Sequence, residues 1–389
     1  MAKKEAYVAY VGTYTNGGSH GIHIYDVDVE KGELFLRRVV PLKNSTFLTL
    51  SRNGKILYSL ADEGVEAFEI QPDGEILPIN MVDMDGMRGH QMTHDRTGKY
   101  LFVGGYHDGK ISMIETLPDG TLGDQLDGVY HKGEGSVGER SWMPHICCVR
   151  MTPDNKFLCA ADSALNRVSI YRINPNTEKL QQVDNLRMGR EVGPRVLHFS
   201  EDGRFAYLLC EISCCVRLYA YSIGEDGYPH FDYIEEYSTL SENHDVYDAA
   251  VSMNLSYDGN YLICSTAGDN SVTIFKVDKA SGKLSRILAL PIAGRFPKAT
   301  CLFPDQKHLA VLNNASNTIT TFAVDYEKGT IVMNARPQTI HNPNCMIFNK
   351  IEKAPEVFRN VSDEEAEKEA AAIMEIRKKK RSISLKQRY

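Results

Sequence analysis

The stretch LHFSEDGRFAYLLCEISCCVRLYAY, residues 197–221, holds the pattern that decides the fold. An apolar run comes first, Asp202-Gly203 follows as a turn, and two further runs rich in aromatic and β-branched residues complete the stretch. An Asp-Gly pair between alternating apolar segments is a strong signal for a β-hairpin. The stretch therefore predicts three consecutive antiparallel strands.

Five other parts of the chain repeat this pattern. They are LTLSRNGKILYSLADEGVEAFEI (48–70), MTHDRTGKYLFVGGYHDGKISMI (92–114), VRMTPDNKFLCAADSALNRVSIYRI (149–173), MNLSYDGNYLICSTAGDNSVTIFKV (253–277) and CLFPDQKHLAVLNNASNTITTFAV (301–324). The corresponding turn positions, 44 to 57 residues apart, are Asn53, Thr97, Asp154, Asp202, Asp258 and Asp305. A repeat of about 50 residues with about four strands per copy is typical of a β-propeller.

A seventh copy is divided between the two ends of the chain. AYVAYVGTYT (6–15), GIHIYDVD (21–28) and LFLRRVV (34–40) resemble strands two to four of a repeat, and NCMIFNK (344–350) resembles strand one. We therefore expect an all-β fold, a seven-bladed β-propeller over residues 1–352 in which strands from both termini share one blade. Such closure removes an exposed sheet edge.

The remaining segment, residues 353–389, differs in composition. Ser362 and Glu365 have the spacing of a helical capping box, and acidic residues precede basic ones, as the helix dipole favours. We expect a C-terminal helix and a frayed basic tail. The helix packs against the propeller rim in the simpler interpretation, and serves oligomerisation or an acidic partner surface in the alternative.

Composition limits the class of partner. The 389 residues are 42% hydrophobic and 24% charged, with a net charge of −7, which argues against nucleic acid as the main partner. No apolar segment suits a signal peptide or a membrane span, so we expect a cytoplasmic protein without membrane association. The nine cysteines include adjacent pairs unsuited to a disulfide, which indicates free buried thiols in a reducing compartment.

Polar residues recur where the first strand of each repeat begins and the second ends, two points that lie side by side in an antiparallel pair. Seven residues before the turns stand Thr46, His90, Cys147, Arg195, Val251 and Lys298, and nine residues after them Asp62, Tyr106, Ser163, Glu211, Ala267 and Asn314. The third repeat adds His145 and Asp162, and the seventh adds Asn342, Asn344 and Thr13. We expect these side chains to meet at one end of the central channel, although each taken singly is equally compatible with a solvated loop. Arg195 and Lys298 suit a carboxylate or phosphate, so a small anionic ligand is indicated.

Several motifs resemble those of the seven-bladed lactonase family, which includes bacterial 6-phosphogluconolactonases of the propeller type and a fungal carboxymuconate lactonising enzyme. The motifs are YVGTYT (10–15), GIHIYDVD (21–28), H-KGEG (131–135), MPHIC (143–147), GPR (193–195) and LLCE (208–211). The resemblance spans residues 6–350 and implies hydrolysis or formation of a lactone at the channel mouth. It implies catalytic roles for His145, Arg195 and Glu211. Three other family positions differ here: Ala267 replaces an arginine, and Cys147 and Val196 replace histidines.

Lactone hydrolysis needs a base for water, a cation for the oxyanion and an acid for the leaving alkoxide. His145, Arg195 and Glu211 offer these groups, and we expect substrate contacts from His90, Lys298, Asp162, Tyr106, Asn314 and Asn344. The leading substrate is 6-phosphogluconolactone, and we expect no cofactor or required metal, although Asp162, Glu211 and His145 carry metal-binding groups. Open alternatives are a structural Arg195–Glu211 ion pair, a non-catalytic propeller that binds a ligand or protein, and a lactone-forming cycloisomerase. The sequence fits either a monomer or a homodimer.

Overall fold

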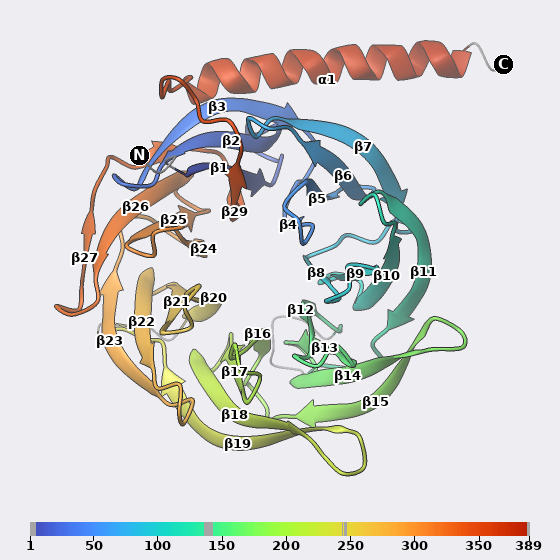
Figure 1. Cartoon of the computed structure of the whole chain (residues 1–389), viewed down its shortest axis with the longest axis vertical. Helices are drawn as coiled ribbons and strands as arrows, with labels where there is room; N and C mark the ends of the chain where they lie inside the picture. The colour runs from blue at the N-terminus through green and yellow to red at the C-terminus, as the bar shows by residue number, and fades with distance from the viewer. Residues whose placement is uncertain (1–4, 136–142, 243, 245–246, 387–389) are drawn as a thin grey trace.

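Seven antiparallel sheets form a closed ring around a central channel in the computed structural model (Figure 1). The structure describes residues 5–135, 143–242, 244 and 247–386, with side chains described as far as residue 375. Six sheets are built from four consecutive strands, one of them with a short additional strand, and the seventh combines three N-terminal strands with one C-terminal strand. The prediction of a seven-bladed propeller is therefore confirmed.

Equivalent strands of the blades have the same place in each sheet, although the innermost strands range from three to nine residues in length. The innermost strands are β4 (Leu48–Leu50), β8 (Gln91–His94), β12 (Ile146–Met151), β16 (Pro194–Phe199), β20 (Ala249–Leu255), β24 (Pro297–Leu302) and β29 (Pro343–Ile351). The second strands are β5 (Ile56–Ala61), β9 (Tyr100–Gly104), β13 (Phe157–Asp162), β17 (Phe205–Cys210), β21 (Tyr261–Ala267), β25 (His308–Asn313) and β1 (Ala6–Thr13). The third strands are β6 (Gly64–Ile70), β10 (Lys110–Thr116), β14 (Arg167–Asn174), β18 (Cys215–Ile223), β22 (Ser271–Val277), β26 (Thr318–Asp325) and β2 (Gly21–Asp28). The outer strands are β7 (Ile76–Asp83), β11 (Leu122–Tyr130), β15 (Lys179–Arg187), β19 (Pro229–Ser238), β23 (Leu284–Pro291), β27 (Thr330–Met333) and β3 (Glu33–Pro41); the short strand β28 (Gln338–Thr339) pairs with β26.

Both ends of the chain contribute to one blade, with the strand order β29-β1-β2-β3. Strand β29 pairs antiparallel with β1, so that Tyr10 lies opposite Ile347, and β24 and β4 contact β29 from the neighbouring blades. The ring is thus closed by hydrogen bonds between segments more than 300 residues apart. Because β29 pairs with β1, the inner edge of β1 is not left unpaired.

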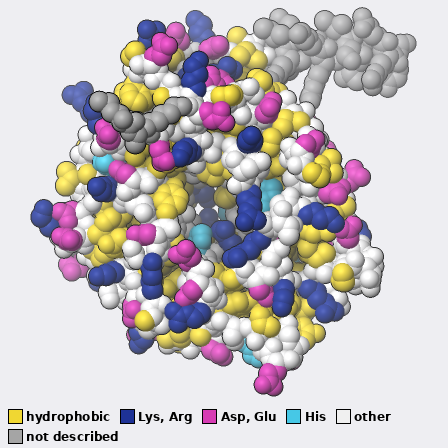
Figure 2. Space-filling model, viewed as in Figure 1, with side chains coloured by type: hydrophobic (Ala, Val, Ile, Leu, Met, Phe, Trp, Pro, Cys, Tyr) yellow, Lys and Arg dark blue, Asp and Glu magenta, His cyan; other side chains and the backbone are white. Residues whose placement is uncertain are grey.

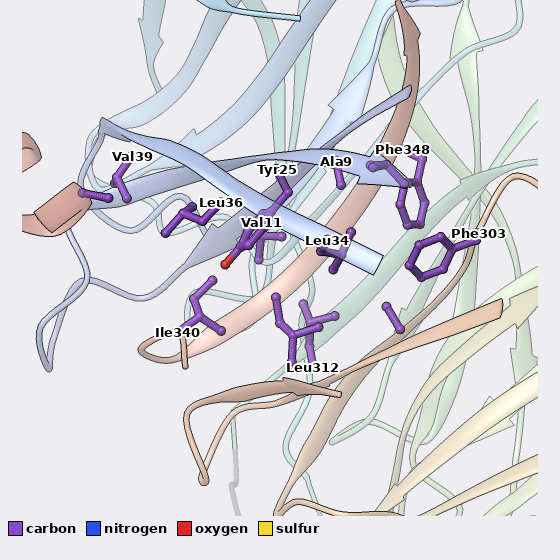
Figure 3. Packing of buried hydrophobic residues seen from close by; sticks show 14 of the residues in the cluster. Ala9, Val11, Tyr25, Leu34, Leu36, Val39, Phe303, Leu312, Ile340 and Phe348 are labelled. Atoms are coloured by element: carbon purple, nitrogen blue, oxygen red, sulfur yellow. The ribbon is translucent and has the colours of Figure 1, made fainter. Parts of the chain in front are cut away.

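Apolar side chains fill the spaces between neighbouring blades. In the cluster beside the closing blade, the rings of Phe303 and Phe348 lie 4.8 Å apart, and Leu312 and Ile340 pack nearby (Figure 3). Burying one such side chain contributes about 1.5–3 kcal/mol. Because each blade supplies apolar residues to both of its neighbours, the blades stabilise one another around the whole ring.

A β-bulge recurs near the start of the innermost strand. One extra residue interrupts the pairing with the second strand in five blades, at Cys147, Arg195, Val251, Lys298 and Asn344. Bulges redirect the side chain of the extra residue. Figure 2 shows that one face of the molecule is hollow at its centre and that Lys, Arg and His side chains surround the hollow.

The C-terminal helix α1 (Asp363–Lys386) lies outside β3 (Figure 1). The hydroxyl of Ser362 accepts a hydrogen bond from the backbone N–H of Glu365 at 3.2 Å, so the predicted N-cap is present. Ala366 and Ala370 are buried against the closing blade. The end of the expected basic tail, residues 387–389, lies outside the described residues. Within the part of the chain that the structure describes, no helix is both long and apolar enough to cross a membrane.

All nine cysteines are free thiols, and eight of them are buried. The adjacent pairs at 147–148 and 214–215 form no disulfide, which confirms the expectation from their spacing.

Candidate active site

Side chains at the start of the innermost strands reach across to the backbone of the next blade. His90 Nδ1 lies 2.9 Å from the carbonyl oxygen of Cys147, and Arg195 Nε donates to the carbonyl of Val251 at 3.0 Å. Asn344 Nδ2 donates to the carbonyl of Thr46 in the same way. These bonds fix the direction of each side chain at the channel wall.

Arg195 and Glu211 form a buried ion pair at one end of the channel. Arg195 Nη1 donates to Glu211 Oε2 at 2.6 Å, and only 6% and 15% of the two side chains are exposed. The turn at Asp202-Gly203 reverses the chain, and the backbone N–H of Glu211 donates to the carbonyl of Gly193. Burial lowers the pKa of Arg195, but the charge and hydrogen bond of Glu211, together with Cys147 and Tyr106, outweigh this effect, and the net pKa lies above the usual value. The guanidinium therefore stays charged.

Tyr106 lies between two imidazoles. Its ring stacks on His145 at a centroid distance of 4.0 Å and on His90 at 5.4 Å. Burial lowers the pKa of His145, and burial together with the charges of Lys298 and Arg195 places the pKa of His90 well below the usual range. Both imidazoles are therefore neutral at pH 7, and each offers a proton acceptor.

Lys298 belongs to the same end of the channel as Arg195, although it lies two blades further round the ring. Burial and the charge of Arg195 lower the pKa of Lys298 to about 8, while Glu211 opposes the shift. The charge of Glu211 likewise opposes the lowering of the His145 pKa. Arg195, Glu211 and Lys298 therefore interact electrostatically; Arg195 and Lys298 also act on His90, and Glu211 acts on His145.

Three of the expected substrate-binding residues make strong contacts within the protein. The carboxylate of Asp162 is fully buried; it lies 2.6 Å from His131 Nδ1 and accepts the backbone N–H of His145 at 2.9 Å. Through this bond to the backbone of His145, the Asp162 carboxylate positions His145. Asn314 Nδ2 donates to the carbonyl of Pro343 at 3.1 Å. Asn344 is buried, and its Oδ1 has no hydrogen-bond partner among the described residues.

Sequence reasoning placed Thr13 at the channel end, and the structure corrects this by one residue. Thr13 is fully buried, and its hydroxyl bonds Ser19 and the carbonyl of Gly21. Tyr14 takes the position equivalent to Glu211, because its N–H donates to Asn342 O just as Glu211 N–H donates to Gly193 O. The charge of Arg195 lowers the pKa of Tyr14, although burial raises it overall, so Tyr14 also lies near the ion pair. No turn joins the first and second strands of this blade, so residue counting has no reference point there, and the strand pairing identifies the equivalent residue.

Two of the positions that differ from the family motifs, Ala267 and Cys147, lie in separate blades and are both buried. Ala267 is buried in a small cluster with Ala249 and Val251. The thiol of Cys147 lies 3.3 Å from the hydroxyl of Ser163, and burial raises its pKa to about 12, so it remains protonated.

One end of the propeller channel combines an ion pair, neutral imidazoles and a second cation. These are the groups that an enzyme acting on a small anionic molecule needs. Residues 8–348 match the family described as Lactonase, 7-bladed beta-propeller. The chain belongs to this family.

Individual relatives agree with this assignment. The chain is 30% identical to a 6-phosphogluconolactonase of Formosa agariphila over 83% of its own length and 94% of the relative. It is 26% identical to a 6-phosphogluconolactonase of Bacillus subtilis over 88% of this chain and 98% of the relative. The structure of a periplasmic gluconolactonase from Pseudomonas aeruginosa is similar with a TM-score of 0.82 and 26% identity, covering 90% of this chain and all of that chain.

Proposed function

We propose that the protein hydrolyses the lactone of a phosphorylated sugar acid, with 6-phosphogluconolactone as substrate and 6-phosphogluconate as product. The observation that carries the proposal is the buried Arg195–Glu211 pair, which lies within electrostatic range of Lys298 and His145. Family membership and the names of the relatives support lactone chemistry. Two cations at one channel end support an anionic substrate.

The proposed mechanism assigns one step to each polar group. His145 is neutral at pH 7 because its pKa is lowered, so it takes a proton from the attacking water. Arg195 keeps its charge and stabilises the oxyanion that develops on the lactone carbonyl. Glu211 fixes the orientation of Arg195 through the 2.6 Å bond, and it carries the proton toward the leaving alkoxide. Water adds across the ester C–O bond, which opens the ring to a carboxylate and a hydroxyl.

The proposed substrate contacts come from the rest of the ring. Lys298 binds the phosphate as a point charge, and His90 and Tyr106 line the approach to His145. Asn344 offers its unpartnered Oδ1 to a sugar hydroxyl, Asn314 completes the rim, and Asp162 acts through His145. We propose a cytoplasmic location, which the free buried thiols support.

A panel of lactones tests the proposal. We expect turnover of 6-phosphogluconolactone to exceed that of gluconolactone and of a muconate lactone, measured as acid release above the spontaneous rate. Lys298→Ala should raise KM for the phosphorylated lactone and leave gluconolactone unaffected. Lys307→Ala is the matched control, because Lys307 is exposed in the same blade near the turn at the other end of the strands. A protein that hydrolyses none of these lactones, while still binding 6-phosphogluconate, would be a non-catalytic binding propeller. Preferential ring closure of an unsaturated diacid would identify a cycloisomerase.

A further inference from the structure

Four titratable side chains gather where helix α1 begins, apart from the candidate active site. His23 Nε2 lies 2.9 Å from Glu367 Oε1 and 3.4 Å from Asp363 Oδ1. His20 Nδ1 lies 2.7 Å from the other oxygen of Glu367. Asp363 and Glu367 are four residues apart and so lie on one face of the helix. His20 precedes β2, and His23 lies within it.

The cluster is buried but poorly satisfied by the protein itself. His23 is completely buried, and 8% of the Glu367 side chain and 15% of the Asp363 side chain are exposed. Among the described residues, both ring nitrogens of His23, Asp363 Oδ1 and Glu367 Oε1 have no hydrogen-bond partner with suitable geometry. Buried groups without well-aligned hydrogen bonds destabilise the fold, and here the carboxylates meet His23 Nε2 only as ion pairs at 2.9 and 3.4 Å. A group that satisfies several of them at once would remove this destabilisation.

The spacing of the three donor atoms suits a metal ion. Nε2 of His23, Oδ1 of Asp363 and Oε1 of Glu367 all lie within 4.8 Å of one another. Ligands bound tetrahedrally at about 2.0–2.1 Å are separated by roughly 3.4 Å. The distance from His23 Nε2 to Asp363 Oδ1 is 3.4 Å, and the distance to Glu367 Oε1, 2.9 Å, is somewhat shorter. One imidazole and two carboxylates without sulfur favour a first-row divalent ion of borderline or hard character.

The surroundings provide an outer partner and access. His20 holds the second oxygen of Glu367, the kind of outer contact that orients a metal ligand. Asp363 and Glu367 also line a cavity of about 720 Å³ together with Tyr25 and His341. The cavity gives an ion a path to the cluster and leaves space for water as a further ligand.

We propose that His23, Asp363 and Glu367 bind one divalent first-row metal ion, such as Zn²⁺, through Nε2, Oδ1 and Oε1, and that His20 orients Glu367 from outside. The ion would join helix α1 to the closing blade, because His23 lies in β2 and both carboxylates lie in the helix. The site is structural, and it is separate from lactone hydrolysis at the channel.

Titration of the metal-stripped full chain with Zn²⁺, followed by calorimetry, tests the proposal. We expect one equivalent to bind tightly, and Glu367→Gln and Asp363→Asn each to weaken that site at least tenfold. Glu369→Gln is the control, because Glu369 is exposed on the same helix and should bind zinc as the parent does. Saturating zinc should raise the Tm of the parent and the control but not of the two site variants.

Cobalt gives a second readout that does not depend on the variants. Co²⁺ bound by one nitrogen and carboxylate oxygens should produce a visible absorption band in the parent that zinc displaces. The proposal is wrong if the folded parent binds no ion, or if Glu367→Gln binds zinc as tightly as the parent. In either case the cluster would be a hydrogen-bonded imidazole–carboxylate group. Neither experiment depends on lactone turnover, so failure of the proposed function would not affect the result.

Discussion

Glu211→Gln gives the sharpest test of the candidate active site. The substitution keeps an oxygen near Arg195 Nη1 but removes the charge from a pair separated by 2.6 Å with only 15% of the carboxylate side chain exposed. At a charge separation of about 4 Å and an effective dielectric of about 20, the lost attraction is about 4 kcal/mol. The variant no longer pays the penalty of burying a charged carboxylate. The net loss in the free energy of unfolding should therefore be about 1.5–3 kcal/mol, the range for a hydrogen bond to a charged group. We expect the Tm to fall by about 2–4 °C.

The effect on catalysis should be larger than the effect on stability. If Glu211 orients Arg195 and transfers a proton, kcat/KM for 6-phosphogluconolactone should fall by about 10²–10⁴. The pH profile should change as well. Glu211 raises the pKa of Lys298, which is about 8, so its neutralisation should lower that pKa and move the alkaline loss of substrate binding to lower pH. Initial rates from pH 6 to 9, corrected for spontaneous hydrolysis, measure both effects.

Glu236→Gln in the same blade is the matched control. Glu236 lies 3.2 Å from Arg217, but 49% of its side chain is exposed, so its loss should cost less than about 1 kcal/mol and leave kcat/KM unchanged. A folded Glu211→Gln protein with the parental kcat/KM and pH profile would refute the catalytic assignment. A loss of stability alone, without loss of turnover, would make the Arg195–Glu211 pair purely structural.

Three further predictions concern separate groups. His145→Ala should lower kcat/KM by about 10²–10⁴. In the parent, the loss of activity toward acid pH, measured by initial rates, should lie below the ordinary histidine pKa of about 6.5, because burial lowers the pKa of His145. A loss of activity that begins above that value would contradict the assignment. Lys298 loses its proton as the pH rises through about 8. Calorimetry should therefore show that 6-phosphogluconate binding weakens from pH 7 to 9 in the parent but not in Lys298→Met. Binding that does not change with pH in the parent would argue against phosphate contact. Ser362→Ala should weaken the start of α1 by about 1 kcal/mol, seen as faster amide exchange at Glu365, and unchanged exchange there would show that the cap is not needed.

The fold could be predicted because its determinants are local. Each turn between the first and second strands carries its own Gly, Asn or Asp signal, and apolar runs of strand length flank each turn. Repetition then fixes the architecture, since each blade must pack against two neighbours. Assigning strands from both termini to one blade followed from the same pattern, and the pairing of Tyr10 with Ile347 confirms it.

The site was predicted less completely because side-chain direction depends on contacts distant in sequence. Counting from the turn placed Arg195 beside Glu211. In the closing blade no turn joins the first two strands, so counting gave Thr13 where the pairing shows Tyr14. The direction of the Asp162 carboxylate is set by His131, which comes from the segment after β11. Neither strand alternation nor turn chemistry carries information about such a contact.

We propose that Lys298 supplies the second cation of the site, where the family resemblance implies an arginine at position 267. Ala267 packs with Ala249 and Val251, so this blade contributes an apolar wall, while the next blade places Lys298 within range of Arg195. The channel end therefore has two cations without an arginine at 267. The substitution has a chemical consequence, because an arginine keeps its charge at every working pH whereas Lys298, with a pKa of about 8, does not. A site built from Arg195 and Lys298 should therefore bind its anionic substrate most tightly below pH 8, and this alkaline limit should disappear in Lys298→Arg.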